Sequence, residues 1–146
     1  MMGKLYIAYG SNLNLEQMAN RCPTAKVVGP SEIKGHKLVF RGPHAHAVAT
    51  VEPCKGESVP VLVWQITSSD EKALDRYEGW PHLYRKETMK IKIDKKTVNA
   101  MVYIMNEGRP LNQPSCYYYS IILEGYKSAG FDIENLKNVF NISFEL

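Results

Sequence analysis

The stretch Tyr6–Asn14 reads YIAYGSNLN: four apolar or aromatic residues are followed at once by three small or polar ones. This pattern predicts a buried strand that ends at Gly10, which would supply a positive φ or a close backbone approach. The amides of Ser11, Asn12 and Leu13 would then lack a strand partner beside a helix start, an arrangement that suits a carboxylate or an oxyanion. An ordinary strand-to-helix turn is the alternative. Neither the glycine spacing of a dinucleotide fingerprint nor a P-loop lysine is present.

Outward from this stretch, capping residues, glycines and alternating apolar residues predict the other elements. The expected helices are Leu15–Arg21, a second from a Ser68 cap with Glu71 to Gly79, a third from Ser115 to about Ala129, and a last from Asp132 to about Phe140. The expected strands are Lys4–Tyr9, His36–Arg41, Ala47–Glu52, Val59–Ile66, Met89–Ile93 and Val98–Met105. Consecutive strands predict an α+β fold with a largely antiparallel sheet, curled or closed, and helices outside.

Composition narrows the class of protein. A length of 146 residues predicts one domain over residues 1–146, and the net charge of +3 with dispersed lysines does not indicate a nucleic-acid partner. The three cysteines are odd in number and form no CxxC, which favours reduced thiols in a cytoplasmic protein. No secretory signal and no apolar run near about 20 residues is present, so we expect no membrane partner.

Glu78, in LDRYEGWPHLYRKE, is the candidate acid. It falls at the expected end of a helix before Gly79, where a negative charge opposes the helix dipole. If Tyr77, Trp80 and Pro81 desolvate it, its pKa rises toward neutral pH, which suits a group that accepts and returns a proton. A surface glutamate beside a glycine cap is the alternative.

Other chemically active residues indicate less. His44 and His46 would lie on one strand face, but no third metal ligand is evident. The tyrosine run 117–119 points in three directions on a helix, which argues against a stacking platform for bases. Cys116 has no basic partner in the sequence and is not expected to be a nucleophile.

Four motifs occur in one order: YGSNL at 9–13, VLVWQI at 61–66, LDRYEG at 74–79 and PSCYYYSIILEGYKSAG at 114–130. With them the sequence resembles the γ-glutamylcyclotransferase family, including the AIG2-like and BtrG-like proteins, from Lys4 to about Gly130. The resemblance implies a small, mostly antiparallel β-barrel-like sheet surrounded by helices.

The resemblance also implies an activity. A γ-glutamyl amide would be cyclised by its own α-amine to 5-oxoproline, releasing an amine or amino acid without a metal or other cofactor. It implies that Glu78 is the catalytic acid/base. The substrate-binding residues that it implies are Tyr9, Gly10, Ser11, Asn12, Leu13 and Tyr118.

A non-catalytic binding or regulatory module that retains the glutamyl pocket is the alternative function. In either case we expect a small-molecule γ-glutamyl ligand as partner and a monomer or homodimer.

Overall fold

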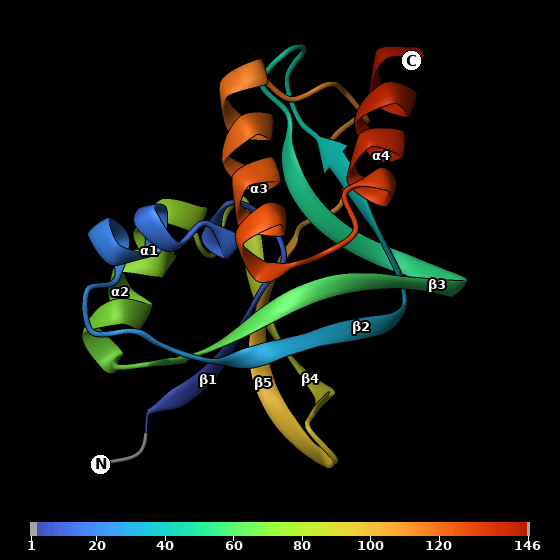
Figure 1. The fold of residues 1–146 in the computed structure, drawn as a ribbon. Helices are drawn as coiled ribbons and strands as arrows, with labels where there is room; N and C mark the ends of the chain where they lie inside the picture. The colour runs from blue at the N-terminus through green and yellow to red at the C-terminus, as the bar shows by residue number, and fades with distance from the viewer. Residues whose placement is uncertain (1–2, 146) are drawn as a thin grey trace.

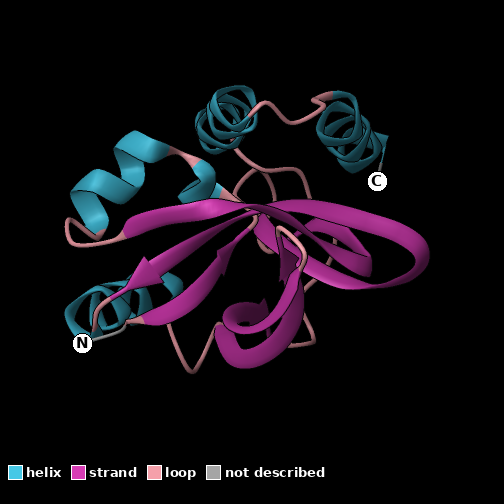
Figure 2. Cartoon of the chain, turned by 60° about the horizontal axis from the view of Figure 1, so that its bottom comes forward, coloured by secondary structure: helices cyan, strands magenta, loops and turns pink. Residues whose placement is uncertain are grey.

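A computed structural model of the chain describes residues 3–145. Within them, five strands form one sheet in the order β2-β3-β1-β5-β4, with β1 and β5 parallel and the other neighbours antiparallel. Helices lie on both sides of the sheet (Figure 2), and α3 and α4 stand side by side (Figure 1). The elements are β1 (Lys4–Ala8), η1 (Ser11–Leu13), α1 (Leu15–Arg21), β2 (Lys26–Arg41), β3 (Val48–Ile66), α2 (Ser68–Glu78), β4 (Tyr84–Ile93), β5 (Lys96–Met105), α3 (Cys116–Ala129) and α4 (Glu134–Glu145). The α+β prediction is confirmed.

The two long strands β2 and β3 form a ladder that breaks near its middle. Lys26–Lys34 pairs with Ser58–Gln65, whereas His36–Arg41 pairs with Val48–Pro53 after a shift in register that leaves residues 54–57 without a partner in β2. The sequence predicted three shorter strands here and none over 26–34. Its glycines and prolines therefore located the irregularity, but they do not end the strands.

The start of α2 differs from the prediction by one residue. Thr67 is the N-cap, and its side chain and that of Asp70 form the reciprocal capping box expected of Ser68 and Glu71. The Glu71 carboxylate instead accepts a hydrogen bond from Lys86 Nζ at 2.7 Å. Glu71, which the local spacing predicted as part of the cap, thus forms a tertiary ion pair instead.

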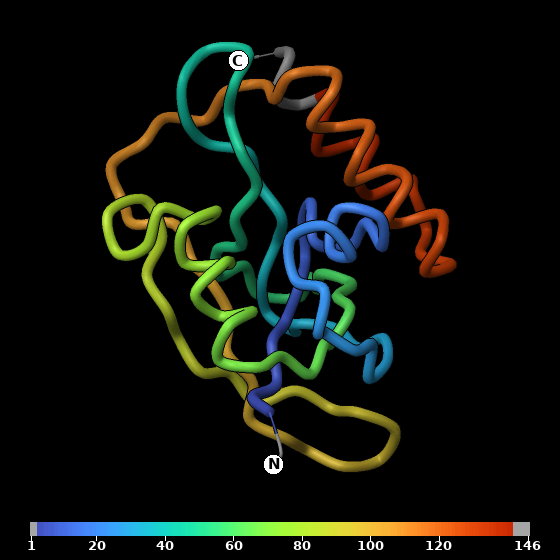
Figure 3. Tube along the Cα trace, turned by 90° about the vertical axis from the view of Figure 1, so that its left-hand side faces the viewer, coloured from blue at the N-terminus to red at the C-terminus, as the bar shows by residue number. Residues whose placement is uncertain are grey.

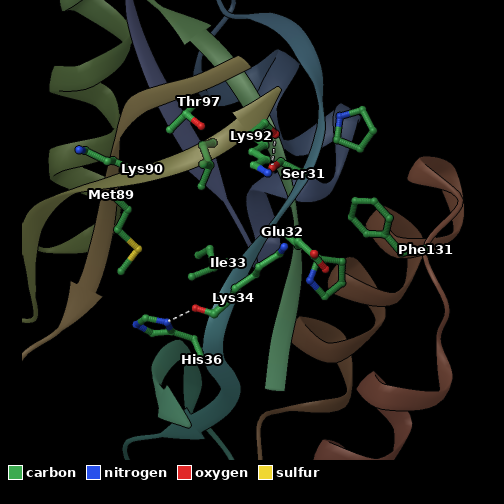
Figure 4. Close-up of a pocket in the computed structure, with 13 residues that line it drawn as sticks. Ser31, Glu32, Ile33, Lys34, His36, Met89, Lys90, Lys92, Thr97 and Phe131 are labelled. Carbon is green, nitrogen blue, oxygen red and sulfur yellow. Dashed lines mark hydrogen bonds between the residues drawn. The ribbon is translucent and has the colours of Figure 1, made fainter. Parts of the chain in front are cut away.

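The sheet curls without closing, so "barrel-like" describes its curvature only. Its edge strands β2 and β4 meet where Ser31 Oγ donates to the Lys92 carbonyl at 2.5 Å, and beside that contact lies a hollow of about 720 Å³. Ile33, Met89 and Phe131 line it, and the last two flank β2 in Figure 4. Register breaks and lysines along these edges are features that protect exposed strands from pairing with other chains.

The β2–β3 turn and the β4–β5 turn lie at opposite ends of the molecule (Figure 3). In residues 3–145, no helix combines the length and apolar character needed to cross a membrane. Helix α3 crosses over η1 at Gly125, where a Cβ would lie 2.6 Å from Leu13 Cβ and 2.9 Å from the Asn14 nitrogen. This close crossing fixes the turn after β1 against α3.

The crossing predicts that Gly125→Ala lowers the free energy of unfolding by about 2 kcal/mol, because the added methyl group overpacks a contact that backbone atoms cannot vacate. In an unobstructed helix the same change stabilises by about 1 kcal/mol. Denaturant unfolding measures the difference, with the exposed α3 variant Ser120→Ala as control. A Gly125→Ala protein as stable as the parent contradicts the crossing.

Candidate active site

A cavity of about 220 Å³ opens where the end of β1, the start of β3 and the end of α2 come together. It is lined by Tyr6, Tyr9, Gly10, Ser11, Asn12, Val48, Ala49, Tyr77, Glu78, Leu83, Tyr84, Tyr103 and Tyr118. Six of the seven residues predicted from the sequence are among them. Leu13 is not: it is fully buried beneath α3, where it supports the turn.

Gly10 approaches its neighbours closely. Its φ of −124° is not left-handed, so the positive-φ alternative is wrong for this residue. A Cβ here would lie 3.3 Å from Ala49 Cβ and 3.6 Å from Tyr118 Oη. The glycine therefore keeps space open inside the cavity.

The turn after Gly10 leaves two backbone donors unused. The Leu13 amide donates to the Gly10 carbonyl at 3.0 Å, whereas the amides of Ser11 and Asn12 donate to no group within residues 3–145. The first amides of a short helix have no internal acceptor. These two donors are thus available at the cavity.

The side chains of Ser11 and Asn12 are already engaged within the protein. Ser11 Oγ shares a hydrogen bond of 2.8 Å with Tyr77 Oη, and Asn12 Nδ2 donates to Tyr6 Oη at 2.8 Å. The Asn12 Oδ1 accepts a hydrogen bond from Arg21. These contacts hold the turn in place and leave its amides, rather than its side chains, for a ligand.

Glu78 is the last residue of α2, and Gly79 ends the helix in the left-handed conformation with φ of 65°, as predicted. Its carboxylate makes no hydrogen bond or ion pair within the part of the chain that the structure describes. Burial raises the pKa of Glu78 to about 7, and the positive charge of Arg21 opposes the rise. A group with such a pKa can accept and release a proton near neutral pH.

Tyrosines around the carboxylate are held by backbone groups. Tyr9 Oη donates to the Tyr103 carbonyl at 2.6 Å, and Tyr84 Oη donates to the Ala49 carbonyl at 2.5 Å. Tyr118 Oη accepts from the Ala49 amide at 3.1 Å, which leaves its own hydrogen for a ligand. Burial raises the pKa of Tyr9, Tyr84 and Tyr118 above the usual value, so they remain neutral donors.

Sequence reasoning missed several of the lining residues, above all Tyr6, Tyr84 and Tyr103. Six of the nine tyrosines of the chain line this one cavity. Tyrosine hydroxyls inside otherwise apolar strands were the available signal, because a buried phenol needs a polar partner.

His44 and His46 do not lie on one face of a strand, as the sequence had suggested. Both residues lie in the β2–β3 turn and are exposed. Across residues 3–145, no group of three or more His, Cys, Asp or Glu side chains is arranged to hold a metal ion.

Comparison with known proteins identifies the family. The model described as "Gamma-glutamyl cyclotransferase, AIG2-like" matches residues 6–121. The chain belongs to this family. Its relatives include the "Gamma-glutamylcyclotransferase" of Bos taurus, 28% identical over 94% of this chain and 78% of that protein, and that of Homo sapiens, 30% identical over 89% and 73%.

Solved structures agree with this membership of the γ-glutamyl cyclotransferase family. The chain superposes on the uncharacterized human protein loc79017 with a TM-score of 0.83 at 27% identity, covering 95% of this chain and 87% of that one. A structure named "Gamma-glutamyl cyclotransferase" gives 0.78 at 26% identity, covering 93% and 85%. The relatives are named as enzymes, and this family member is a γ-glutamylcyclotransferase-like enzyme.

The pKa of Glu78 predicts a stability that depends on pH. In the folded protein the Glu78 carboxyl keeps its proton up to about pH 7, whereas the ordinary pKa of a glutamate is 4.5. The contribution of Glu78 to the free energy of unfolding is therefore fully present below pH 4.5 and is lost as the pH rises through 7. The stability of Glu78→Gln should therefore match that of the parent near pH 4 and exceed it above pH 7, by at most about 3.5 kcal/mol at 1.4 kcal/mol per pKa unit.

Unfolding free energies measured from pH 4 to 8.5 test this, with Glu124→Gln on the exposed face of α3 as the matched control. The control should show no such divergence. A Glu78→Gln gain that is absent above pH 7 indicates an ordinary, solvated carboxylate.

Proposed function

We propose that this protein cyclises a γ-glutamyl amide to 5-oxoproline and releases an amine or amino acid, with Glu78 as general acid/base. The observation that carries the proposal is the presence of Glu78, with a pKa near 7, in one cavity with the Ser11 and Asn12 amides. The names of the relatives support the same activity.

Glu78 moves two protons in turn. Glu78 takes a proton from the substrate's α-ammonium, and the freed amine attacks the γ-carbonyl carbon to close a five-membered ring. The carbonyl electron pair moves to oxygen and then returns as the bond to the leaving nitrogen breaks. Glu78 returns its proton to that nitrogen and, as a carboxylate again, takes the extra proton that the ring nitrogen still carries. This second proton passes to the released amine, which leaves as an ammonium, and Glu78 ends as a carboxylate. As written, the reaction uses no metal or cofactor.

The substrate carries two negative oxygens for the cavity to bind: its α-carboxylate and the oxyanion that develops on the γ-carbonyl. The Ser11 and Asn12 amides and the Tyr118 hydroxyl are the available donors. Fixed donors aimed at a developing oxyanion stabilise the transition state without having to reorganise.

The size of the cavity favours the glutamyl group as the part of the substrate held inside. At about 220 Å³ it is smaller than the roughly 300–1,000 Å³ typical of pockets for drug-sized ligands. The leaving group would project toward the solvent. Folding the glutamyl chain so that amine and carbonyl meet supplies much of the acceleration, because oriented intramolecular reactions reach effective molarities of about 10⁵ M or more.

Glu78→Gln should abolish turnover because the amide cannot accept the ammonium proton. Release of 5-oxoproline from γ-glutamyl amino acids, γ-glutamylamines and glutathione measures this, with Glu124→Gln as the control. For the parent, kcat/KM should fall about tenfold per pH unit below pH 7. Turnover by Glu78→Gln at a near-parental rate refutes the assignment of Glu78 as the base. A parent protein that binds 5-oxoproline tightly but turns over none of these substrates is instead a binding module.

Gly10→Ala should lower kcat/KM by about 10- to 100-fold, since a misplacement of about 1 Å can cost that much. The added Cβ would meet Ala49 Cβ at 3.3 Å and narrow the space beside Tyr118. The double variant Gly10→Ala/Ala49→Gly removes that contact and should recover activity. Parental kinetics for Gly10→Ala would mean that no substrate atom comes near this position.

A further inference from the structure

Arg21, the last residue of α1, reaches both halves of the cavity wall. Its guanidinium donates to Asn12 Oδ1 on the turn after β1 and, at 3.0 Å, to Gln17 Oε1 on its own helix. The same group lies 3.4 Å from the centre of the Tyr77 ring, next to Glu78 in the chain. Stacking on an aromatic face while donating in plane is the geometry to which arginine is suited.

These contacts connect the turn after β1 with the end of α2. Tyr77 Oη bonds to Ser11 Oγ at 2.8 Å, so Arg21 and Ser11 together join the end of α2 to the turn at two points. Along the chain, the turn and Tyr77 are more than 60 residues apart. The position of the Glu78 carboxylate relative to the turn amides therefore depends on Arg21.

Arg21 also supplies charge. Within residues 3–145 it forms no ion pair with a carboxylate, and it is the cation whose field acts on Glu78. Lys86, the nearest lysine beyond α2, is already paired with Glu71 and Asp75. The remaining titratable groups that line the cavity are phenols: Tyr6 from β1, Tyr9 directly after β1, Tyr77 from α2, Tyr84 from β4, Tyr103 from β5 and Tyr118 from α3.

We propose that Arg21 is the positioning residue of this site: it sets the register between the acid and the amide turn, and its charge sustains the carboxylate form of Glu78. The role in turnover rests on the proposed function, whereas the coupling between Arg21 and Glu78 does not. A positioning role for Arg21 is distinct from a packing role, because it predicts effects on proton affinity.

The coupling is tested without any substrate. The stability gain of Glu78→Gln is measured against pH in the parent and in an Arg21→Gln background. Removing the cation should move the titration midpoint of Glu78 in the folded protein, which is the pH at which the gain levels off, from about pH 7 upward by roughly 0.5–1 unit. Arg76→Gln, which removes an exposed arginine two residues before Glu78, is the matched control and should leave the midpoint in place.

The kinetics separate charge from geometry. Arg21→Gln should move the acid limb of the kcat/KM profile to higher pH by the same increment, and it should also lower kcat. Arg21→Lys keeps the charge but cannot both stack on Tyr77 and hold Asn12, so it should retain the acid limb while kcat falls about tenfold. Arg76→Gln should match the parent in both.

An unmoved midpoint in Arg21→Gln overturns the charge role, and a parental kcat in Arg21→Lys overturns the positioning role. If Arg21→Gln does not fold, the midpoint in Arg21→Lys should stay near pH 7, and a change of half a unit or more contradicts the account. A parent that releases no 5-oxoproline refutes the proposed function alone, because the stability cycle still reports the coupling.

Discussion

Glu78 sits at the end of α2 within a cavity lined by six tyrosines, and no group in residues 3–145 hydrogen-bonds to its carboxylate. Burial of an ionisable group without a partner lowers stability when the group is charged. This loss of stability is present at the last residue of α2, where a solvated side chain would end the helix equally well. Such a compromise between stability and chemistry is typical of catalytic acids, whose pKa must lie near the working pH.

The rest of the fold holds the turn amides and the Tyr118 hydroxyl in the same cavity as that carboxylate. Strand β1 delivers the turn from the middle of the sheet, and α3 holds it down through the close contact between Gly125 and Leu13. Tyr118 on the same helix meets the Ala49 amide at the start of β3. Because helix and strand positions are set by extensive packing, these donors have fixed positions in the folded chain, as the proposed function requires of groups that stabilise a developing oxyanion.

Local sequence signals predicted much of this arrangement, and long-range ones did not. Asn14 predicted the start of α1, and Gly79 predicted the end of α2, since caps depend on a few adjacent residues. The full length of β2 was missed because its pairing with β3 is decided across a register break. Tyr84 was missed as a lining residue, and Arg21 as a residue that contacts the lining, since both take these places only through tertiary contacts. Motif spacing names residues of a site, but the network that orients them emerges only in the folded chain.

The central claim is that the Glu78 carboxylate is desolvated in the cavity of the free protein. Carbon-13 NMR of protein labelled at the glutamate side-chain carboxyl carbon follows its titration directly, with the resonance assigned by its loss in Glu78→Gln. The account predicts a midpoint near pH 7 for the Glu78 resonance. A midpoint at the ordinary value of 4.5 would mean a carboxylate open to bulk water, and the account of the site would be wrong.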